Sequence, residues 1–203
     1  MSAITIPEPE ASVIDRSIRS FVSPGATLSG EQRRSLAEIS RASMADPDLI
    51  DRADPLESLA VRFTVAAHTL RSNDVAAAER DGIPVATYVE VLGLVARLVA
   101  VDTFCFAVGA DAPVLPSAAE GGPTGVVATE ATIDGGWVPT VGPAWPPSAL
   151  SLIPAEDEAL HDLHGVFYLS MEGMADFDAD RGLHRTQMEL VAARTSLLNE
   201  CFF

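Results

Sequence analysis

The sequence is poor in basic residues. Its 203 residues include 13 lysine and arginine side chains against 29 aspartate and glutamate side chains, which gives a net charge of −16 and a pI near 4.4. Nucleic acids and anionic membrane surfaces are bound through clusters of basic side chains. The sequence has no such cluster, so we expect neither nucleic acid nor a membrane among its partners.

Cysteines, targeting signals and long apolar runs are also scarce. Cys105 and Cys201 are too few and too far apart for a disulfide framework. The opening residues, MSAITIPEPEAS, lack the basic start and the apolar run of a secretory signal. The most apolar stretch, residues 84–109, is interrupted by three charged residues and is not expected to span a membrane. Together these absences favour a cytoplasmic protein.

Strand patterns are nearly absent, whereas helix signals are frequent. Ser29 and Gln32 have the spacing of a capping box. Asp54 can cap a helix that begins at Pro55. Pro84 opens an apolar helix of roughly 20–25 residues, which is expected to lie buried at the centre of its unit. The predicted fold class is all-α, a helical bundle.

Residues 110–150 have a different composition. The stretch 109–150 holds seven prolines and seven glycines and shows no helical period. A structureless loop of this length is unusual inside one compact domain. We therefore interpret residues 110–150 as a connector between a helical unit at 1–109 and a second unit at 151–203. Trp137 and Trp145 are expected to hold the connector against the units, and VVATEATI to add a short strand.

The second unit ends in an amphipathic helix, residues 186–198. Its apolar side continues into the last residues and comprises Leu190, Leu197, Leu198, Phe202 and Phe203. Half a helical bundle leaves such a face uncovered, and exposed apolar patches usually pair. We therefore expect a homo-oligomer.

Cys201 is the first candidate for chemistry. Asn199 is a favourable N-cap residue, so it should end the preceding helix and place Cys201 in the first turn of a new one. A helix N-terminus favours the thiolate form of cysteine.

Glu189 is the second candidate and precedes Cys201 by twelve residues. On one straight helix this offset is about 18 Å along the axis, so contact requires the break at Asn199. A simpler interpretation competes, because Thr186 and Glu189 also match a capping box.

The segment GLHRTQMELVAARTSLLNECFF resembles the approach to the active site of the alkylhydroperoxidase D / carboxymuconolactone decarboxylase family. In the peroxidase branch of that family, a similar helix runs into a Cys-x-x-Cys or Cys-x-x-Sec motif. Glu189, Arg194, Asn199 and Cys201 occupy matching places. Residues 54–109 are similar to the three helices that follow the motif in the family.

The resemblance implies an alkylhydroperoxidase D-like bundle in which a degenerate unit is followed by the opening half of a second unit. In the first unit, Arg34 stands in the place of Glu189 and Asp46 in the place of the first motif cysteine. The first unit is therefore not expected to be active.

The function implied by the resemblance is a thiol or seleno peroxidase acting on small peroxides. The second motif residue would attack the peroxide, Cys201 would resolve the product, a dithiol reductant would reduce it, and Glu189 would handle protons. That second residue would follow Phe203, and we expect its codon to be UGA, encoding selenocysteine; a designed end or a frameshift is the alternative. The 203-residue chain alone is then not expected to turn over peroxide.

Two other functions stay open, a non-catalytic helical assembly module and a lyase like the carboxymuconolactone decarboxylases.

His161 and His164 have helical spacing and could ligate a metal, but no third ligand is indicated, so we predict no metal site. Cys105 is expected to be a buried apolar thiol.

Overall fold

The computed structural model describes residues 4–48 and 54–200, and the fold of these residues is all-helical, as predicted. Short 3₁₀ turns lie at Ala67–Thr69, Pro146–Ser148 and Gly173–Ala175. The α-helices in the described residues are α1 (Glu10–Ser20), α2 (Gly30–Ala45), α3 (Pro55–Val65), α4 (Ser72–Arg80), α5 (Val85–Ala107), α6 (Pro154–Phe167) and α7 (Arg185–Leu198).

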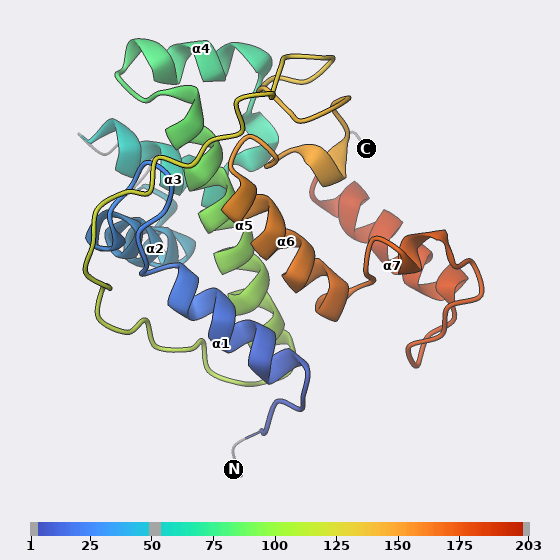
Figure 1. The fold of residues 1–203 in the computed structure, drawn as a ribbon. Helices are drawn as coiled ribbons and strands as arrows, with labels where there is room; N and C mark the ends of the chain where they lie inside the picture. Colours follow the sequence, from blue (N-terminus) through green and yellow to red (C-terminus); the bar gives the residue numbers. More distant parts are fainter. Residues whose placement is uncertain (1–3, 49–53, 201–203) are drawn as a thin grey trace.

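Helix α5 forms the centre of the molecule. Helices α1, α2, α3, α4 and α6 all pack against it, whereas α7 lies at the edge of the molecule beyond α6 (Figure 1). Leu94, Leu98 and Val101 of α5 are fully buried in the main hydrophobic core. The prediction of a buried central helix is therefore confirmed.

The helix ends follow the local signals in the sequence. Ser29 Oγ accepts a hydrogen bond from the Gln32 amide at 3.2 Å, and Gln32 Oε1 accepts one from the Ser29 amide at 2.9 Å, which completes the capping box. Asp54 caps α3 at the amides of the second and third helical residues, and Pro55 is its first residue. Gly82 follows α4 with φ +86°, a conformation that side chains with a Cβ rarely adopt.

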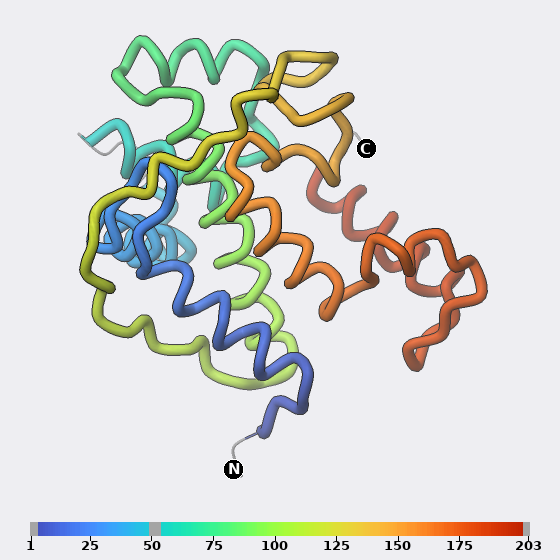
Figure 2. The backbone as a smooth tube through the Cα atoms, viewed as in Figure 1, coloured from blue at the N-terminus to red at the C-terminus, as the bar shows by residue number. Residues whose placement is uncertain are grey.

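The 110–150 connector lies along the helical body. In Figure 2 it passes from the C-terminal end of α5 around the outside of the helices to the start of α6. Its backbone amides at residues 119, 124 and 125 donate hydrogen bonds to the carbonyls of Val22, Gly25 and Ala26, at 2.8–2.9 Å. Leu115 is its buried apolar side chain near the start. Backbone hydrogen bonds therefore attach the connector to the loop between α1 and α2.

Two expectations for the connector are wrong. Trp137 and Trp145 remain 51% and 60% exposed, so the attachment does not depend on them. The stretch VVATEATI forms no strand, and the pairing reduces to one isolated bridge between Thr132 and Thr140. The prolines of the connector lack the backbone N–H that a strand needs, so the connector is held by a few separate hydrogen bonds and not by a sheet.

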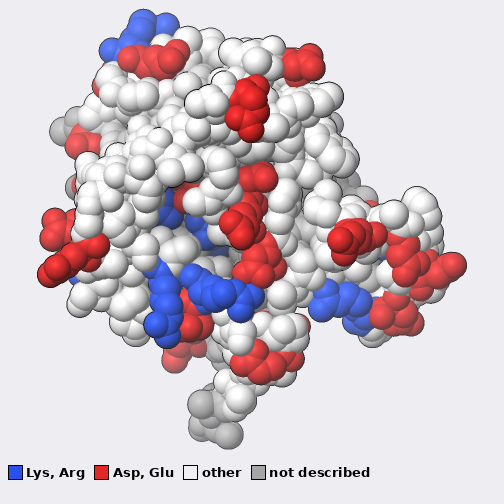
Figure 3. Space-filling model, viewed as in Figure 1, with Lys and Arg blue, Asp and Glu red and all other residues white. Residues whose placement is uncertain are grey.

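Helix α6 belongs to the same packed body as α1 and α5, although its sequence lies beyond the connector. Leu163 joins the main core, and Arg16 of α1 forms a two-bonded ion pair with Asp162, with both N···O distances at 2.9 Å. Figure 3 shows basic groups lying beside acidic groups on this face of the molecule. The division into a degenerate unit and half of a second unit stays a prediction about the sequence.

A cluster of two arginines and two glutamates is enclosed in the body. Arg33 of α2 and Arg97 of α5 are 2% and 1% exposed, and Glu90 of α5 and Glu156 of α6 are 0% and 3% exposed. Arg33 Nη1 lies 2.6 Å from Glu90 Oε1 and 2.8 Å from Glu156 Oε1, and Arg97 Nη2 donates to Glu156 Oε2. We call these four residues the buried quartet.

Further polar atoms of the quartet bind the end of α1 and the loop after it, whereas Arg33 Nε and Arg97 Nε are buried without a hydrogen-bond partner among the described residues. Arg97 Nη1 donates to Ser20 Oγ at 2.8 Å, and Arg33 Nη2 donates to the Ser20 carbonyl at 3.2 Å. The Thr27 amide and hydroxyl both donate to Glu90 Oε2, at 2.6 and 2.7 Å. The quartet therefore connects α1, α2, α5 and α6 at one place.

Gly93 gives the first test of this packing. A Cβ at Gly93 would lie 2.8 Å from Glu156 Oε2 and 2.9 Å from Glu156 Cβ, and the latter atom cannot swing aside. We expect Gly93→Ala to lower the free energy of unfolding by about 1–2 kcal/mol, because overpacking outweighs the better helix propensity of alanine. Chemical denaturation measures the change.

The control is Gly165→Ala in α6, where the nearest atom to a new Cβ is 3.7 Å away. This variant should be neutral or more stable by up to about 1 kcal/mol. Equal effects at both glycines would contradict the packing argument.

The second test uses pH. Burial raises the pKa of Glu156, but the charges of Arg97 and Arg33 outweigh burial and hold this pKa below its ordinary value of 4.5. A depressed folded-state pKa stabilises the protein above the ordinary value, and this stability is lost as the pH falls through the folded-state pKa. We expect Glu156→Gln to cost about 3–5 kcal/mol near neutral pH and progressively less below pH 4.5.

Denaturation from neutral to acidic pH measures this difference. Glu158→Gln, on the exposed side of the same helix, should change stability little at any pH. A Glu156→Gln deficit that is the same at all pH values would show that the charge of Glu156 is not responsible.

Candidate functional site

Helix α7 carries Glu189 and is the most weakly buried helix of the fold. Among its described residues, Arg185 is the buried one. Leu190, Leu197 and Leu198 are 72%, 68% and 68% exposed, as expected for an uncovered apolar face. The helix is therefore attached to the body mainly through its first turn and the preceding loop.

Arg185 provides that attachment. Its Nη1 donates to the carbonyls of Gly173, Met174 and Asp176 at 3.2–3.4 Å, and its guanidinium lies 5.9 Å from the centroid of the Phe177 ring. These contacts fix the loop between α6 and α7 against the first turn of α7. Arg185 is thereby placed to face Glu189, one turn further along the helix.

Glu189 is held through one of its two carboxylate oxygens. Tyr168 Oη donates to Glu189 Oε1 at 2.5 Å, and Arg185 Nε donates to the same oxygen at 2.6 Å. These hydrogen bonds, first that of Tyr168 and then that of Arg185, hold the pKa of Glu189 below its ordinary value. Within the described residues, Oε2 makes no hydrogen bond. The group is therefore an oriented, ionised carboxylate with one oxygen available.

The alternative role of Glu189 as a helix cap is wrong. The residue that caps α7 is His184, whose ring accepts from the Thr186 amide at 3.3 Å, while Gln187 Oε1 accepts from the His184 amide at 3.0 Å. The capping box thus begins two residues earlier than Thr186. Glu189 is free of the helix end and turns toward Tyr168.

Asn199 ends α7, as predicted, and its backbone is not in the extended conformation of an N-cap residue. It is the C-cap residue, with φ −93° and ψ 8°, and its Nδ2 donates to the Thr195 carbonyl at 3.0 Å. An N-cap residue would have extended backbone angles. Glu200 then adopts φ +54°, so the chain turns sharply. Cys201 lies outside the described residues, as do Phe202 and Phe203.

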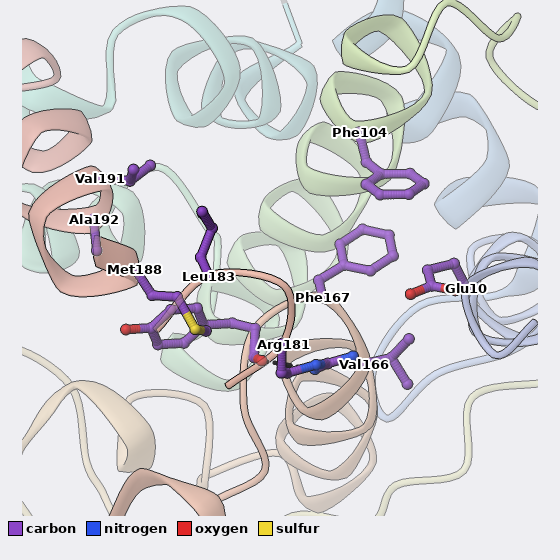
Figure 4. Close-up of a pocket in the computed structure, with 10 residues that line it drawn as sticks. Glu10, Phe104, Val166, Phe167, Arg181, Leu183, Met188, Val191 and Ala192 are labelled. Atoms are coloured by element: carbon purple, nitrogen blue, oxygen red, sulfur yellow. Dashed lines mark hydrogen bonds between the residues drawn. The ribbon is translucent and has the colours of Figure 1, made fainter. Parts of the chain in front are cut away.

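A cavity of about 380 Å³ lies between α7 and the ends of α5 and α6. Tyr168 lines it, so the residue that binds Glu189 is also part of the cavity wall. In Figure 4 the rings of Phe104 and Phe167 lie on one side, and Val191 and Ala192 on the other. The other lining residues are Glu10, Val166, Arg181, Leu183 and Met188.

The other candidates have structural partners. His161 donates to the Pro147 carbonyl at 3.1 Å, and His164 to the Leu169 carbonyl at 2.6 Å. Cys105 is fully buried, as predicted, and burial raises the pKa of its thiol. Within residues 4–48 and 54–200, no group of three or more histidine, cysteine or acidic side chains could hold a metal ion.

Arg34 and Asp46, which the resemblance predicts to be the counterparts of Glu189 and of the first motif cysteine, have simpler surroundings. Arg34 pairs with Glu38 on the same helix at 2.9 Å. Asp46 is the C-cap residue of α2. Neither position gathers the hydroxyl and guanidinium donors that surround Glu189.

Tyr168 is the member of the site that sequence reasoning missed. It lies 21 residues before Glu189, directly after α6, and no local spacing connects the two. Burial, and then the hydrogen bond to Glu189, raise the pKa of its hydroxyl. Only the folded loop brings the pair together.

Comparison with protein-family models, curated proteins and solved structures finds no match. Among the helices that the structure describes, none combines the length and the apolar character that crossing a bilayer demands. The site must therefore be interpreted from its own geometry.

Tyr168→Phe tests the geometry of Glu189. Loss of the hydroxyl donor should raise the pKa of Glu189 toward its ordinary value, because the hydrogen bond of Tyr168 is the largest cause of the depression. Carboxyl-carbon NMR titration measures the shift. Tyr88→Phe, in the core against Phe63, should leave the Glu189 titration unchanged. An unaltered Glu189 pKa in Tyr168→Phe would contradict the arrangement.

Proposed function

We propose that the protein is an alkylhydroperoxidase-like thiol or seleno peroxidase that acts on small peroxides with a dithiol reductant. In this proposal Cys201 is the resolving thiol and Glu189 the proton-handling group. The observation that carries this proposal is the Glu189 carboxylate, held by Tyr168 and Arg185 through one oxygen and unbonded, within the described residues, at the other.

The orientation of Glu189, rather than its basicity, suits proton transfer. Two donors keep the carboxylate ionised, and although their hydrogen bonds lower its pKa and so weaken it as a base, its fixed orientation lowers the entropy lost in the transfer. The adjoining cavity offers space for a small substrate beside Tyr168. An acid that served only to stabilise the helix would need neither the tyrosine nor the cavity.

The end of α7 makes contact between Glu189 and Cys201 geometrically accessible. Glu189 precedes Leu198 by nine positions, which is about 13.5 Å along the helix axis. Asn199 keeps near-helical backbone angles, so only the two residues after it can turn back, by about 7 Å, and the side chains must cover the remainder. A helix continuing through Cys201 would have kept the groups apart, whereas α7 stops at Leu198.

The test is the rate at which Cys201 attacks the neutral disulfide 2,2′-dithiodipyridine, which imitates the resolving step, with the modified residue located by mass spectrometry. We expect Glu189→Gln to slow this attack at least about tenfold, because the proton acceptor is lost.

Glu158→Gln, which removes an exposed carboxylate from α6, should react at the wild-type rate. The buried Cys105 should remain unlabelled and serves as an internal control. A Cys201 that reacts at the same rate in the wild type and in both glutamine variants would overturn the proposal.

A second candidate function is a non-catalytic assembly module. The exposure of Leu190, Leu197 and Leu198 favours it, because a second copy could cover this face in a two-fold pair. The thiol experiment separates the two functions, since an assembly module requires no activated cysteine.

A further inference from the structure

We infer that the cavity beside Tyr168 is a binding site for a small apolar monocarboxylate, such as a medium-chain fatty acid, whose carboxylate is held by Arg181. This inference concerns the cavity alone and does not depend on the chemistry of Cys201. It rests on the lining of the cavity, on the fixed position of its walls and on the partners of Arg181.

The lining suits an apolar ligand. The volume of about 380 Å³ falls within the range of small-molecule sites, which bind apolar bodies through apolar walls and a few placed polar groups. Seven of its ten lining side chains are apolar: Phe104, Val166, Phe167, Leu183, Met188, Val191 and Ala192. The hydrocarbon tail of a ligand bound there would leave water and contact apolar side chains on several sides, which favours binding.

One wall of the cavity is fixed before any ligand arrives. Phe104 of α5 and Phe167 of α6 are stacked, with ring centroids 4.5 Å apart and an interplanar angle of 24°. Both helices belong to the packed body, so this wall requires little ordering on binding.

Arg181 supplies the charge. Its Nη1 donates to the Tyr168 carbonyl at 2.7 Å and to the Gly165 carbonyl at 3.2 Å, which holds the guanidinium at the end of α6. Within the described residues its Nε and Nη2 donate no hydrogen bond, and no carboxylate pairs with it. Figure 4 shows its guanidinium extending toward Val166 within the lining.

These features select an acid over an alcohol or an amine. An arginine with free N–H groups binds a carboxylate through charge-assisted, often paired, hydrogen bonds. The other charged residue of the lining is Glu10, in the first turn of α1, which would oppose an anion placed beside it. The ligand carboxylate therefore sits at Arg181, and the tail lies between the phenylalanine pair and α7.

The experiment is calorimetric titration of the full chain with octanoate, octanol and octylamine, which share one tail and differ in the head group. We expect saturable binding of octanoate, with a Kd at least about tenfold below those of the other two. Equal affinities, tighter binding of octylamine, or no saturable binding would each overturn the inference.

Four variants locate the site. Arg181→Gln should weaken octanoate about tenfold, to the level of octanol, and Arg181→Lys should give an intermediate loss because it keeps the charge. Ala192→Phe should fill the cavity and weaken octanoate and octanol alike. Arg194→Gln, an exposed α7 arginine outside the lining, should bind as wild type.

Circular dichroism checks that each variant keeps its helices. Folded Arg181→Gln that retains wild-type octanoate affinity would exclude Arg181 as the anchor. Folded Ala192→Phe with unchanged binding would exclude the cavity.

Discussion

Four charges enclosed in a helical core must compensate one another, and this requirement determines how the helices of this protein meet. Arg33, Glu90, Arg97 and Glu156 are almost fully buried and sum to zero charge. An ion without its partner would be strongly unfavourable in such surroundings, so packing arrangements that separate these groups are strongly disfavoured. The sequence contains no lysine, and all 13 basic residues are arginines. The planar guanidinium suits this arrangement, because one group can donate to several acceptors in fixed directions.

Helix α7 stands outside this constraint. It buries only Arg185 among its described residues, and its contacts with the rest run through Arg185, Tyr168 and the loop between them. The candidate chemical group, Glu189, is therefore placed at the margin of the body, where local opening costs less free energy than in the core. Binding and catalytic groups are commonly placed at such margins on a rigid scaffold. Here the stacked Phe104 and Phe167 supply the rigid side, and α7 supplies the adjustable side.

The sequence predicted the helical class and most helix ends, because these depend on residues three or four apart. Ser29 with Gln32, and Asp54 with Pro55, are examples. The same reasoning failed at α7. Thr186 with Glu189 matches the usual capping-box pattern, but His184, which is not a usual N-cap residue, provides the cap. The cap at His184 then freed Glu189 for other partners.

Contacts between distant residues could not be predicted. The partners in the buried quartet are at least 57 residues apart, and Tyr168 and Glu189 are 21 apart, so no periodicity relates them. The burial of Trp137 and Trp145 was also predicted wrongly, because both are exposed. Composition identifies side chains that favour burial, but the path of the connector decides whether such a side chain lies against the helices.

The two glycines beside the quartet limit how this protein can evolve. A side chain at Gly25 would overlap the carboxylate of Glu90, and one at Gly93 would press on Glu156. Substitutions at a glycine and at its neighbouring glutamate are therefore coupled. Replacing the glycine alone creates a clash, and replacing the glutamate alone leaves an arginine without its full compensating charge. In any lineage of this protein, positions 25 and 90, and positions 93 and 156, should be inherited as linked pairs.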